Sequence, residues 1–178
     1  MINVARLLLI SFSLALCGCA ATVTNSSNAV DQPLKTSAKP ASVTLFITAS
    51  PEIQASKDWH IFRAEWRSAF DAAASAASIR AAYVESAPTE PSTSTVLIRV
   101  NVNDYRYLTS GSRYGFGVLT GNAFIDAEAE FIEYPMRRTL GKRKYGTTSS
   151  AWEGVFSAMT DKQVRAISDA MLQEVAAR

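Results

Sequence analysis

Residues 95–108 read TVLIRVNVNDYRYL, and this stretch contains the clearest strand pattern in the chain. Its apolar residues occupy every second position: Val96, Ile98, Val100 and Val102. Successive side chains of a strand point to opposite faces, so the pattern predicts a strand with one buried and one solvated face. Such a strand belongs to a sheet that is covered on one side only.

A second alternating stretch covers residues 122–134, where five small or apolar residues alternate with acidic ones. The apolar set is Ala123, Ile125, Ala127, Ala129 and Phe131. A turn at 134–136 then leads into a basic strand from residue 137 to about residue 147. The predicted hairpin pairs Glu133 with Arg137, Glu128 with Lys142, and Asp126 with Lys144. Each such pair contributes roughly 0.2–1 kcal/mol, and the same register leaves Arg143 on the apolar side.

Two short strands and two helices complete the predicted elements. Residues 43–48 and 83–84 predict the strands, because β-branched and aromatic residues are concentrated there. A helix begins after Asp58, its predicted N-cap, and apolar residues recur at helical spacing from Trp59 to Ala77. The C-terminal helix starts with a predicted capping box of Thr160 and Gln163. Its apolar stripe is Val164, Ile167, Met171, Leu172 and Val175.

The order of elements is therefore β-α-β-β-β-β-α. Helices that flank a run of antiparallel strands in sequence pack together on the sheet. We predict an α+β two-layer sandwich, with a mostly antiparallel sheet of about five strands and two helices on one face. Residues 43–178 have the commonest size for one domain.

The first 18 residues have the pattern of an export signal. One positive charge at Arg6 precedes an apolar run over residues 7–16, far shorter than the roughly 20 residues that span a bilayer. The sequence Leu16-Cys17-Gly18-Cys19 resembles the lipobox of bacterial lipoproteins, in which cleavage after Gly18 makes Cys19 the acylated N-terminus. Several acyl chains, such as palmitate, hold a protein firmly in a membrane. By the sorting rule of this class, Ala20 implies the outer membrane, with the domain facing the periplasm.

Two other interpretations of these residues remain open. The first is a plain secretory signal that contains two cysteines by coincidence. The second is processing at Cys17, although Leu16 stands where a small residue is expected. If residues 1–18 are removed, Cys19 is the only cysteine left. The domain would then contain no disulfide, no thiol nucleophile and no cysteine metal site.

Residues 20–42 are small and polar, are punctuated by Pro33 and Pro40, and contain no aromatic residue. Such a segment does not bury enough apolar surface to offset its ordering entropy. We therefore predict a lipidated Cys19 and a flexible tether over residues 19–42, followed by one domain over residues 43–178. Fully extended, residues 20–42 reach about 75–80 Å, and as a coil they average roughly 25–30 Å.

A lipobox, a polar tether and this order of elements resemble the periplasmic lipoprotein domains of the TolB N-terminal type, which include CsgG and LpoB. In a related group of lipoproteins of unknown function, a long strand leads into a Gly-rich turn, a hairpin and a C-terminal helix. The matching stretches here are 96–108, 111–121, 122–145 and 160–176. The resemblance implies the fold and the cellular address, because proteins that share a fold differ widely in function.

Candidate catalytic groups are sparse. His60 is the only histidine, so no second histidine completes a zinc site and no cysteine completes a nucleophile–base pair. No Gly-x-Ser-x-Gly elbow occurs. The carboxylates Asp126, Glu128 and Glu130 either bind a cation or act as acid and base, or they form a solvated face balanced by basic residues. We favour the balanced face, and we expect no enzyme, no metal and no cofactor.

Five basic residues follow the predicted turn: Arg137, Arg138, Lys142, Arg143 and Lys144. Pairing with the carboxylates of the neighbouring strand is one explanation. Contact with anionic lipid head groups or lipopolysaccharide phosphates is the alternative. The formal net charge of only +2 argues against a general attraction to nucleic acid.

The segment 109–121 contains Gly115, Gly117 and Gly121. A nucleotide-binding loop of this kind needs a helix after it, whereas a strand is predicted here. A long hairpin connection that uses glycine for positive φ is the simpler interpretation. A third interpretation is a partner-binding loop, since aromatic residues beside an arginine suit a binding anchor. Its residues are Arg113, Tyr114, Phe116, Val118 and Leu119.

Three functional hypotheses follow. The first is a membrane-anchored, non-catalytic lipoprotein of the Gram-negative cell envelope that docks on a protein partner in the periplasm. The second is a periplasmic module that binds a glycan or small ligand through Trp59 and Trp66. The third is an enzyme, and it ranks last for want of a nucleophile, a base or a metal set.

Overall fold

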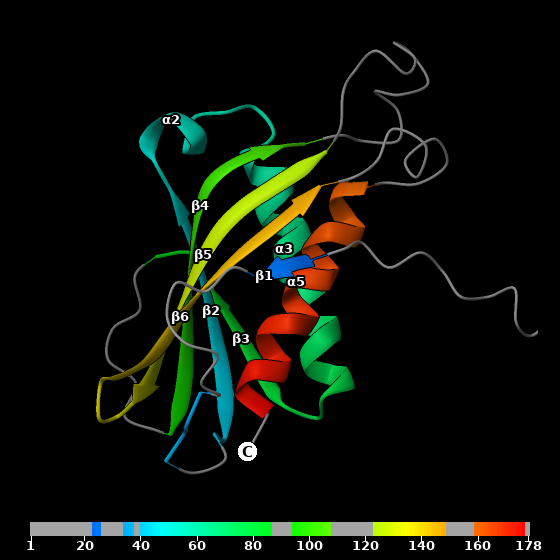
Figure 1. The fold of residues 1–178 in the computed structure, drawn as a ribbon. Helices are drawn as coiled ribbons and strands as arrows, with labels where there is room; N and C mark the ends of the chain where they lie inside the picture. Colours follow the sequence, from blue (N-terminus) through cyan, green and yellow to red (C-terminus); the bar gives the residue numbers. More distant parts are fainter. Residues whose placement is uncertain are drawn as a thin grey trace, which may run out of the picture.

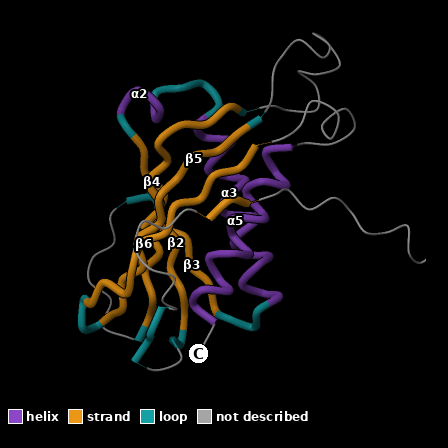
Figure 2. Tube along the Cα trace, in the orientation of Figure 1, coloured by secondary structure: helices purple, strands orange, loops and turns teal. Residues whose placement is uncertain are grey.

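The computed structural model describes residues 23–25, 34–37, 40–86, 94–107, 123–148 and 159–176. They form one six-stranded sheet with two long helices on one of its faces (Figures 1 and 2). The strands are β1 (Val23–Asn25), β2 (Ser42–Ala49), β3 (Arg80–Val84), β4 (Thr95–Arg106), β5 (Phe124–Tyr134) and β6 (Arg138–Thr148). The helices are the one-turn α2 (Pro51–Gln54), α3 (Trp59–Ala76) and α5 (Met159–Ala176). The predicted α+β sandwich and its order of elements are confirmed.

The sheet has the order β1-β6-β5-β4-β2-β3. The long strands β4, β5 and β6 form an antiparallel meander, whereas β2 is parallel to both of its neighbours, β3 and β4. The chain between β2 and β3 contains α3, as a parallel connection requires. The sheet is therefore mixed, with its antiparallel part towards β6 as predicted.

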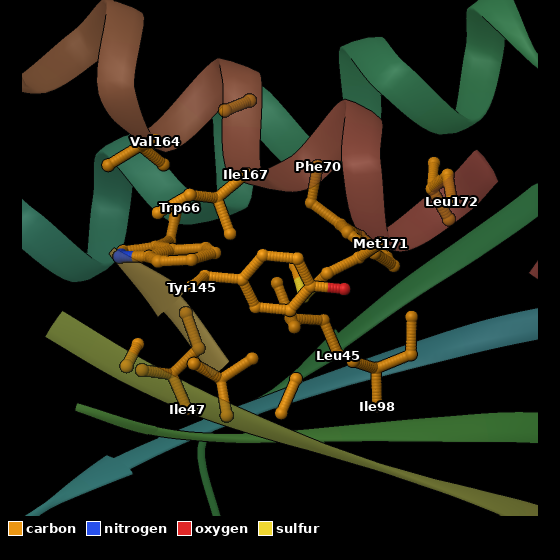
Figure 3. Packing of buried hydrophobic residues seen from close by; sticks show 14 of the residues in the cluster. Leu45, Ile47, Trp66, Phe70, Ile98, Tyr145, Val164, Ile167, Met171 and Leu172 are labelled. Carbon is orange, nitrogen blue, oxygen red and sulfur yellow. The ribbon is translucent and has the colours of Figure 1, made fainter. Parts of the chain in front are cut away.

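The core lies between the sheet and the two long helices (Figure 3). Residues at every second position of β2, β4 and β5 point towards the helices, as the alternation predicted. Figure 3 shows Phe70 of α3 and Met171 of α5 on one side of the Tyr145 ring and Trp66 of α3 on the other, and all four side chains are buried. Full burial of a large apolar side chain contributes about 1.5–3 kcal/mol, so this layer supplies much of the stability of the fold.

The predicted start of α3 after Asp58 is confirmed, whereas the start of α5 differs from the prediction. Asp58 is the N-cap residue of α3, but its side chain makes no capping hydrogen bond, because its carboxylate accepts one from Tyr105 instead. The second helix begins at Met159, one residue before the predicted N-cap Thr160. The Gln163 side chain is fully buried and donates to the Ala123 carbonyl at 3.0 Å. The Gln163 side chain therefore joins α5 to the start of β5. In the predicted capping box it would instead point back towards Thr160.

The hairpin of β5 and β6 exists, but its predicted register is wrong. Glu128 lies opposite Lys144, and Glu130 lies opposite Lys142. The register shifts between Phe131 and Ile132, where β6 carries one extra residue. A β-bulge of this kind is invisible to a count of residues back from the turn. Because the total shift along most of the hairpin is two residues, Arg143 stays on the helix-facing side, as predicted.

Arg143 has a partner that the sequence did not indicate. Its Nε and Nη2 atoms donate to the two carboxylate oxygens of Glu174 in α5, at 3.0 and 3.2 Å. A two-point contact of this kind between arginine and a carboxylate fixes the orientation of both groups. The pair therefore joins the β6 edge of the sheet to the last turn of the C-terminal helix.

The predicted tether is partly folded onto the domain. Val23–Asn25 forms β1, which pairs antiparallel with the outer edge of β6. Leu34 is 3% exposed and belongs to the main core. The Ser37 backbone N–H donates to Glu133 Oε1 at 2.7 Å, and its hydroxyl donates to Oε2 at 2.9 Å. The folded unit therefore begins before residue 43, because this segment finds an open strand edge and a buried carboxylate to bind.

Candidate functional site

The outer face of the sheet, opposite α3 and α5, carries the acidic residues predicted to balance basic ones. Arg99 Nη1 lies 3.3 Å from Glu130, and Lys142 Nζ lies 3.8 Å from both Glu128 and Glu130. Ion pairs of such exposed groups contribute up to about 1 kcal/mol each. Among the described residues, no group of three His, Cys, Asp or Glu side chains is placed to hold a metal ion. The arrangement is that of a solvated face with mixed charge.

The part of the same face near the β5–β6 turn is apolar. Leu97 of β4 packs there with Ile132 and Tyr134 of β5, and partly buried Phe46 of β2 joins them. These residues alternate along their strands with residues of the main core, so they point away from the helices. The outer face thus changes from charged at the β5 start to apolar at the β5–β6 turn.

The five basic residues do not form one patch. Arg137 lies in the turn with φ of 54°, and Arg138 opens β6. Arg138 Nη2 donates to Glu133 at 2.8 Å and to the Lys35 carbonyl at 2.9 Å. Lys142 contacts the outer carboxylates, whereas Arg143 points to the helices. The structure therefore distributes them between the turn and the two faces of β6, with Lys144 exposed near its end.

Glu133 is the carboxylate that holds the N-terminal segment. It is 5% exposed, and it accepts from Ser37 and from Arg138. Burial alone would raise its pKa, but the hydrogen bonds from Ser37 and the charge of Arg138 outweigh burial and hold the pKa below its usual value. The sequence predicted a pair between Glu133 and Arg137 in the hairpin. It did not indicate the contact between Glu133 and Ser37, because Ser37 lies in a segment without periodicity.

A second polar cluster lies where β4 ends against the start of α3. The Tyr105 O–H donates to Asp58 Oδ1 at 2.7 Å, and Ser56 Oγ lies 2.7 Å from the same phenol oxygen. The Tyr105 ring stacks on Phe62 with 4.2 Å between centroids. Burial and the Asp58 carboxylate raise the pKa of Tyr105 to about 12, so the phenol remains a hydrogen-bond donor.

The next residue on the same side, Tyr107, makes the matching contact. Its O–H donates to Glu65 Oε1 at 2.6 Å. Burial raises the pKa of Glu65, and the nearby Asp161 carboxylate adds to the rise, while the Tyr107 hydrogen bond opposes it. Burial and Glu65 together raise the pKa of Tyr107. Both tyrosines therefore tie the end of β4 to the first half of α3.

Tyr105 and Tyr107 were not predicted as a pair because a β-bulge decides where they point. The register between β4 and β5 shifts between Val102 and Asp104, and Asn103 is the extra residue. Without the shift, Tyr105 would lie on the solvated face with Asn101. The sequence carries one faint signal, two adjacent polar residues where strict alternation would place one.

The aromatic pair proposed for a glycan or small ligand is part of the core. Trp59 is 6% exposed and Trp66 is fully buried. Neither ring offers a face on which a sugar could stack. His60, on the same helix, is exposed. Within the described residues, a cavity of about 200 Å³ lies between the last turns of α3 and α5. Its lining is Ala73, Ala76, Ala77, Asp169, Leu172, Gln173 and Ala176.

Several predicted features lie outside the described residues. They are the lipobox at 16–19 and the proposed partner-binding residues Arg113, Tyr114, Phe116, Val118 and Leu119. The strands before and after the segment 109–121 end side by side, because Arg106 of β4 lies opposite Phe124 of β5. No helix in the described part of the chain is long and apolar enough to cross a membrane.

Comparison with known proteins identifies the class of fold. No family model matches the chain, and no curated protein matches it. Among solved structures, the PelC dodecamer from Paraburkholderia phytofirmans superposes with a TM-score of 0.50 and 17% identity, over 89% of this chain and 99% of that one. Protein XCC0632 from Xanthomonas campestris, assigned to the DUF330 family model, superposes with a TM-score of 0.47 and 11% identity, over 79% and 90%.

The chain thus has a two-layer α+β fold similar to that of PelC. At 17% identity the similarity concerns the fold alone. None of these solved structures is of the TolB N-terminal type, so that expected resemblance stays a prediction. Membership of a lipoprotein family likewise stays a prediction.

Proposed function

We propose that this protein is a lipid-anchored lipoprotein of the Gram-negative cell envelope whose folded domain is a non-catalytic binding module. The observation that carries the proposal is the lipobox-like sequence Leu16-Cys17-Gly18-Cys19, and the packing of the segment after it connects the proposed anchor to the domain. Val23–Asn25 pairs with β6 only a few residues after Cys19. A segment that carries an acyl anchor and also forms the edge strand of the sheet would hold the domain close to that anchor.

The site residues support a binding role for the domain. Its buried carboxylates are engaged by a tyrosine, a serine or an arginine, as Glu65 is by Tyr107 and Glu133 by Ser37. These contacts join elements of the fold. The outer face carries exposed groups of both charges, such as Arg99 and Lys142 beside Glu128 and Glu130, and polar, charged rims of this kind surround many protein interfaces. We propose the outer membrane as the location, on the basis of Ala20.

The proposed partner is another envelope protein, and the loop over 109–121 is its proposed contact. Tyr114 and Phe116 beside Arg113 have the residue types that dominate binding energy at interfaces. The solved PelC structure is a dodecamer. The oligomeric state of this chain is therefore part of the test that follows.

The test combines lipid labelling with crosslinking in cells. Cells that express the full chain are fed an alkyne analogue of palmitate and treated with a crosslinker. We expect label on the wild type and on Cys17→Ser, and none on Cys19→Ser. We also expect crosslinks to a second envelope protein or to further copies of the chain.

Two outcomes would contradict the proposal. Label retained by Cys19→Ser would refute lipidation at that residue. A labelled protein that is crosslinked to no protein at all would refute the binding module. Cys17→Ser is the matched control, because it changes the neighbouring cysteine and keeps the residues required for cleavage.

A further inference from the structure

The chain between the proposed lipid and the first strand is very short. Only Ala20, Ala21 and Thr22 separate Cys19 from Val23, the first residue of β1. A fully extended chain advances about 3.3–3.6 Å per residue, so these four steps reach at most about 14 Å. This limit holds for every conformation of the connecting residues.

The described residues that follow contact the β5–β6 hairpin at three places. Val23 lies opposite Thr147, near the end of that strand. Leu34 packs beside Gly141, and Ser37 reaches Glu133 at the other end of the hairpin. The chain therefore runs from the Thr147 end of the sheet towards its turn. The position of Cys19 is restricted to one end of the domain.

That end of the sheet is defined by a row of paired residues. Arg106 lies opposite Phe124, and Phe124 lies opposite Thr148, next to Thr147. We call these four residues the anchored end. The Arg106 guanidinium lies over the Phe124 ring, 5.6 Å from its centroid. Arg106 is exposed and Phe124 is half-buried.

A cation beside an aromatic ring suits the head-group region of a bilayer. Aromatic rings gather at that level, and arginine extends its charge towards lipid phosphates. The opposite end of the sheet carries the turn with exposed Met136. The two ends are about 34 Å apart, since β5 has ten steps of about 3.4 Å between Phe124 and Tyr134.

We propose that the anchored end faces the lipid head groups of the leaflet that carries the acyl chains, with the strands leading away from it. This inference rests on the proposed lipidation of Cys19 and goes beyond it, because it gives the domain a fixed orientation. A domain on the originally expected tether of residues 20–42 would tumble freely above the membrane. With β1 paired to β6, Cys19 lies within about 14 Å of Val23 at the edge of the sheet.

The experiment measures how close each end lies to the lipid. A fluorescent amino acid is encoded in place of Asp126, near the anchored end, or in place of Met136, in the turn; both positions are exposed. The acylated protein is placed in phosphatidylethanolamine–phosphatidylglycerol vesicles with a nitroxide on the lipid head group. We expect quenching several-fold stronger at position 126 than at 136. Equal quenching at the two positions would overturn the proposal.

A variant with a longer connection separates chain length from other causes. Ten Gly and Ser residues inserted between Ala21 and Thr22 keep Cys19 and β1 intact. A flexible chain of that length adds roughly 17 Å on average. We expect quenching at position 126 to fall towards the value at 136. Unchanged quenching would overturn the role of the short connection.

A second preparation distinguishes failure of this inference from failure of lipidation. The chain starting at Cys19 is made without acylation, and a maleimide-linked lipid is attached to the Cys19 thiol. Mass spectrometry of the cell-derived protein reports natural acylation separately. Missing acyl chains would refute the proposed function, whereas equal quenching at 126 and 136 on the synthetic anchor would refute the orientation.

Discussion

At the scale of single residues, Glu65 shows how a carboxylate can be structural. One of its oxygens accepts from Tyr107, and the other, Oε2, is buried without a hydrogen-bond partner among the described residues. Burial raises its pKa above the ordinary value of 4.5. The folded state therefore binds this proton more tightly than the unfolded state. The contribution of Glu65 to the free energy of unfolding is fully present below pH 4.5. It is lost as the pH rises through the pKa that Glu65 has in the folded state.

We expect Glu65→Gln to remove this pH dependence. The amide oxygen can still accept from Tyr107, but it carries no charge to be buried. The free energy of unfolding of the wild type, taken relative to that of the variant, should fall as the pH rises above about 4.5, because the opposite contribution of Glu133 is the same in both proteins. Urea unfolding between pH 4 and pH 7 measures both curves. Glu128→Gln, on the outer face, is the matched control, and a variant that keeps the wild-type slope would contradict the assignment.

At the scale of elements, the contact between the N-terminal segment and β6 depends on one glycine. A Cβ atom added to Gly141 would lie 2.8 Å from Leu34 Cδ2, closer than such atoms approach. Leu34 is almost fully buried, so it has little room to withdraw. The absence of a side chain at 141 is what lets this part of the segment enter the core.

We expect Gly141→Ala to destabilise the protein by about 1–3 kcal/mol, the usual cost of overpacking. In a Leu34→Ala background the same change should cost much less, because its neighbour is gone. Denaturant unfolding of the four proteins gives the coupling as a double-mutant cycle. Additive effects would show that the two residues do not press on each other in solution.

The sequence predicted the elements far better than their relative registers. Alternation in β4 and β5 and helical spacing in α3 and α5 follow from each element burying one face, so they can be read locally. The turn places Glu133 opposite Arg138 and not Arg137, and the extra residue in β6 adds a second position, so the partner of Glu128 is Lys144 and not Lys142. The bulge at Asn103 turns Tyr105 and Tyr107 towards α3. Both depend on strand pairing, which no local pattern contains.

At the scale of the whole molecule, the boundary of the domain differs from the predicted one. The prediction placed residues 20–42 in a tether because they are polar and lack periodicity. A single leucine and three paired backbone units were enough to fold part of it onto the sheet. Local composition cannot show this, because the open β6 edge that accepts β1 is formed by residues far along the chain.

We expect the difference to appear when non-lipidated forms of two lengths are compared. A chain that starts at residue 40 retains β2 but lacks β1, Leu34 and Ser37. It should be about 2–5 kcal/mol less stable than a chain that starts at residue 20, as for loss of one buried leucine. Thermal and urea unfolding compare the two, and Leu34→Ala in the longer form separates the leucine from the rest. Equal stability would restore the predicted boundary at residue 43.

The pairing of β1 with β6 also sets an order of events in the making of the protein. Val23 lies opposite Thr147, so β1 can pair only after β6, the last strand in the sequence, has been made. In a chain that crosses a membrane from its N-terminus, β1 has no place to dock until residues beyond 147 have emerged. For a chain exported as proposed, this order would leave β1 undocked during the period in which the proposed cleavage after Gly18 would occur. Docking of β1 against β6 would then close this edge of the sheet as a late step of folding.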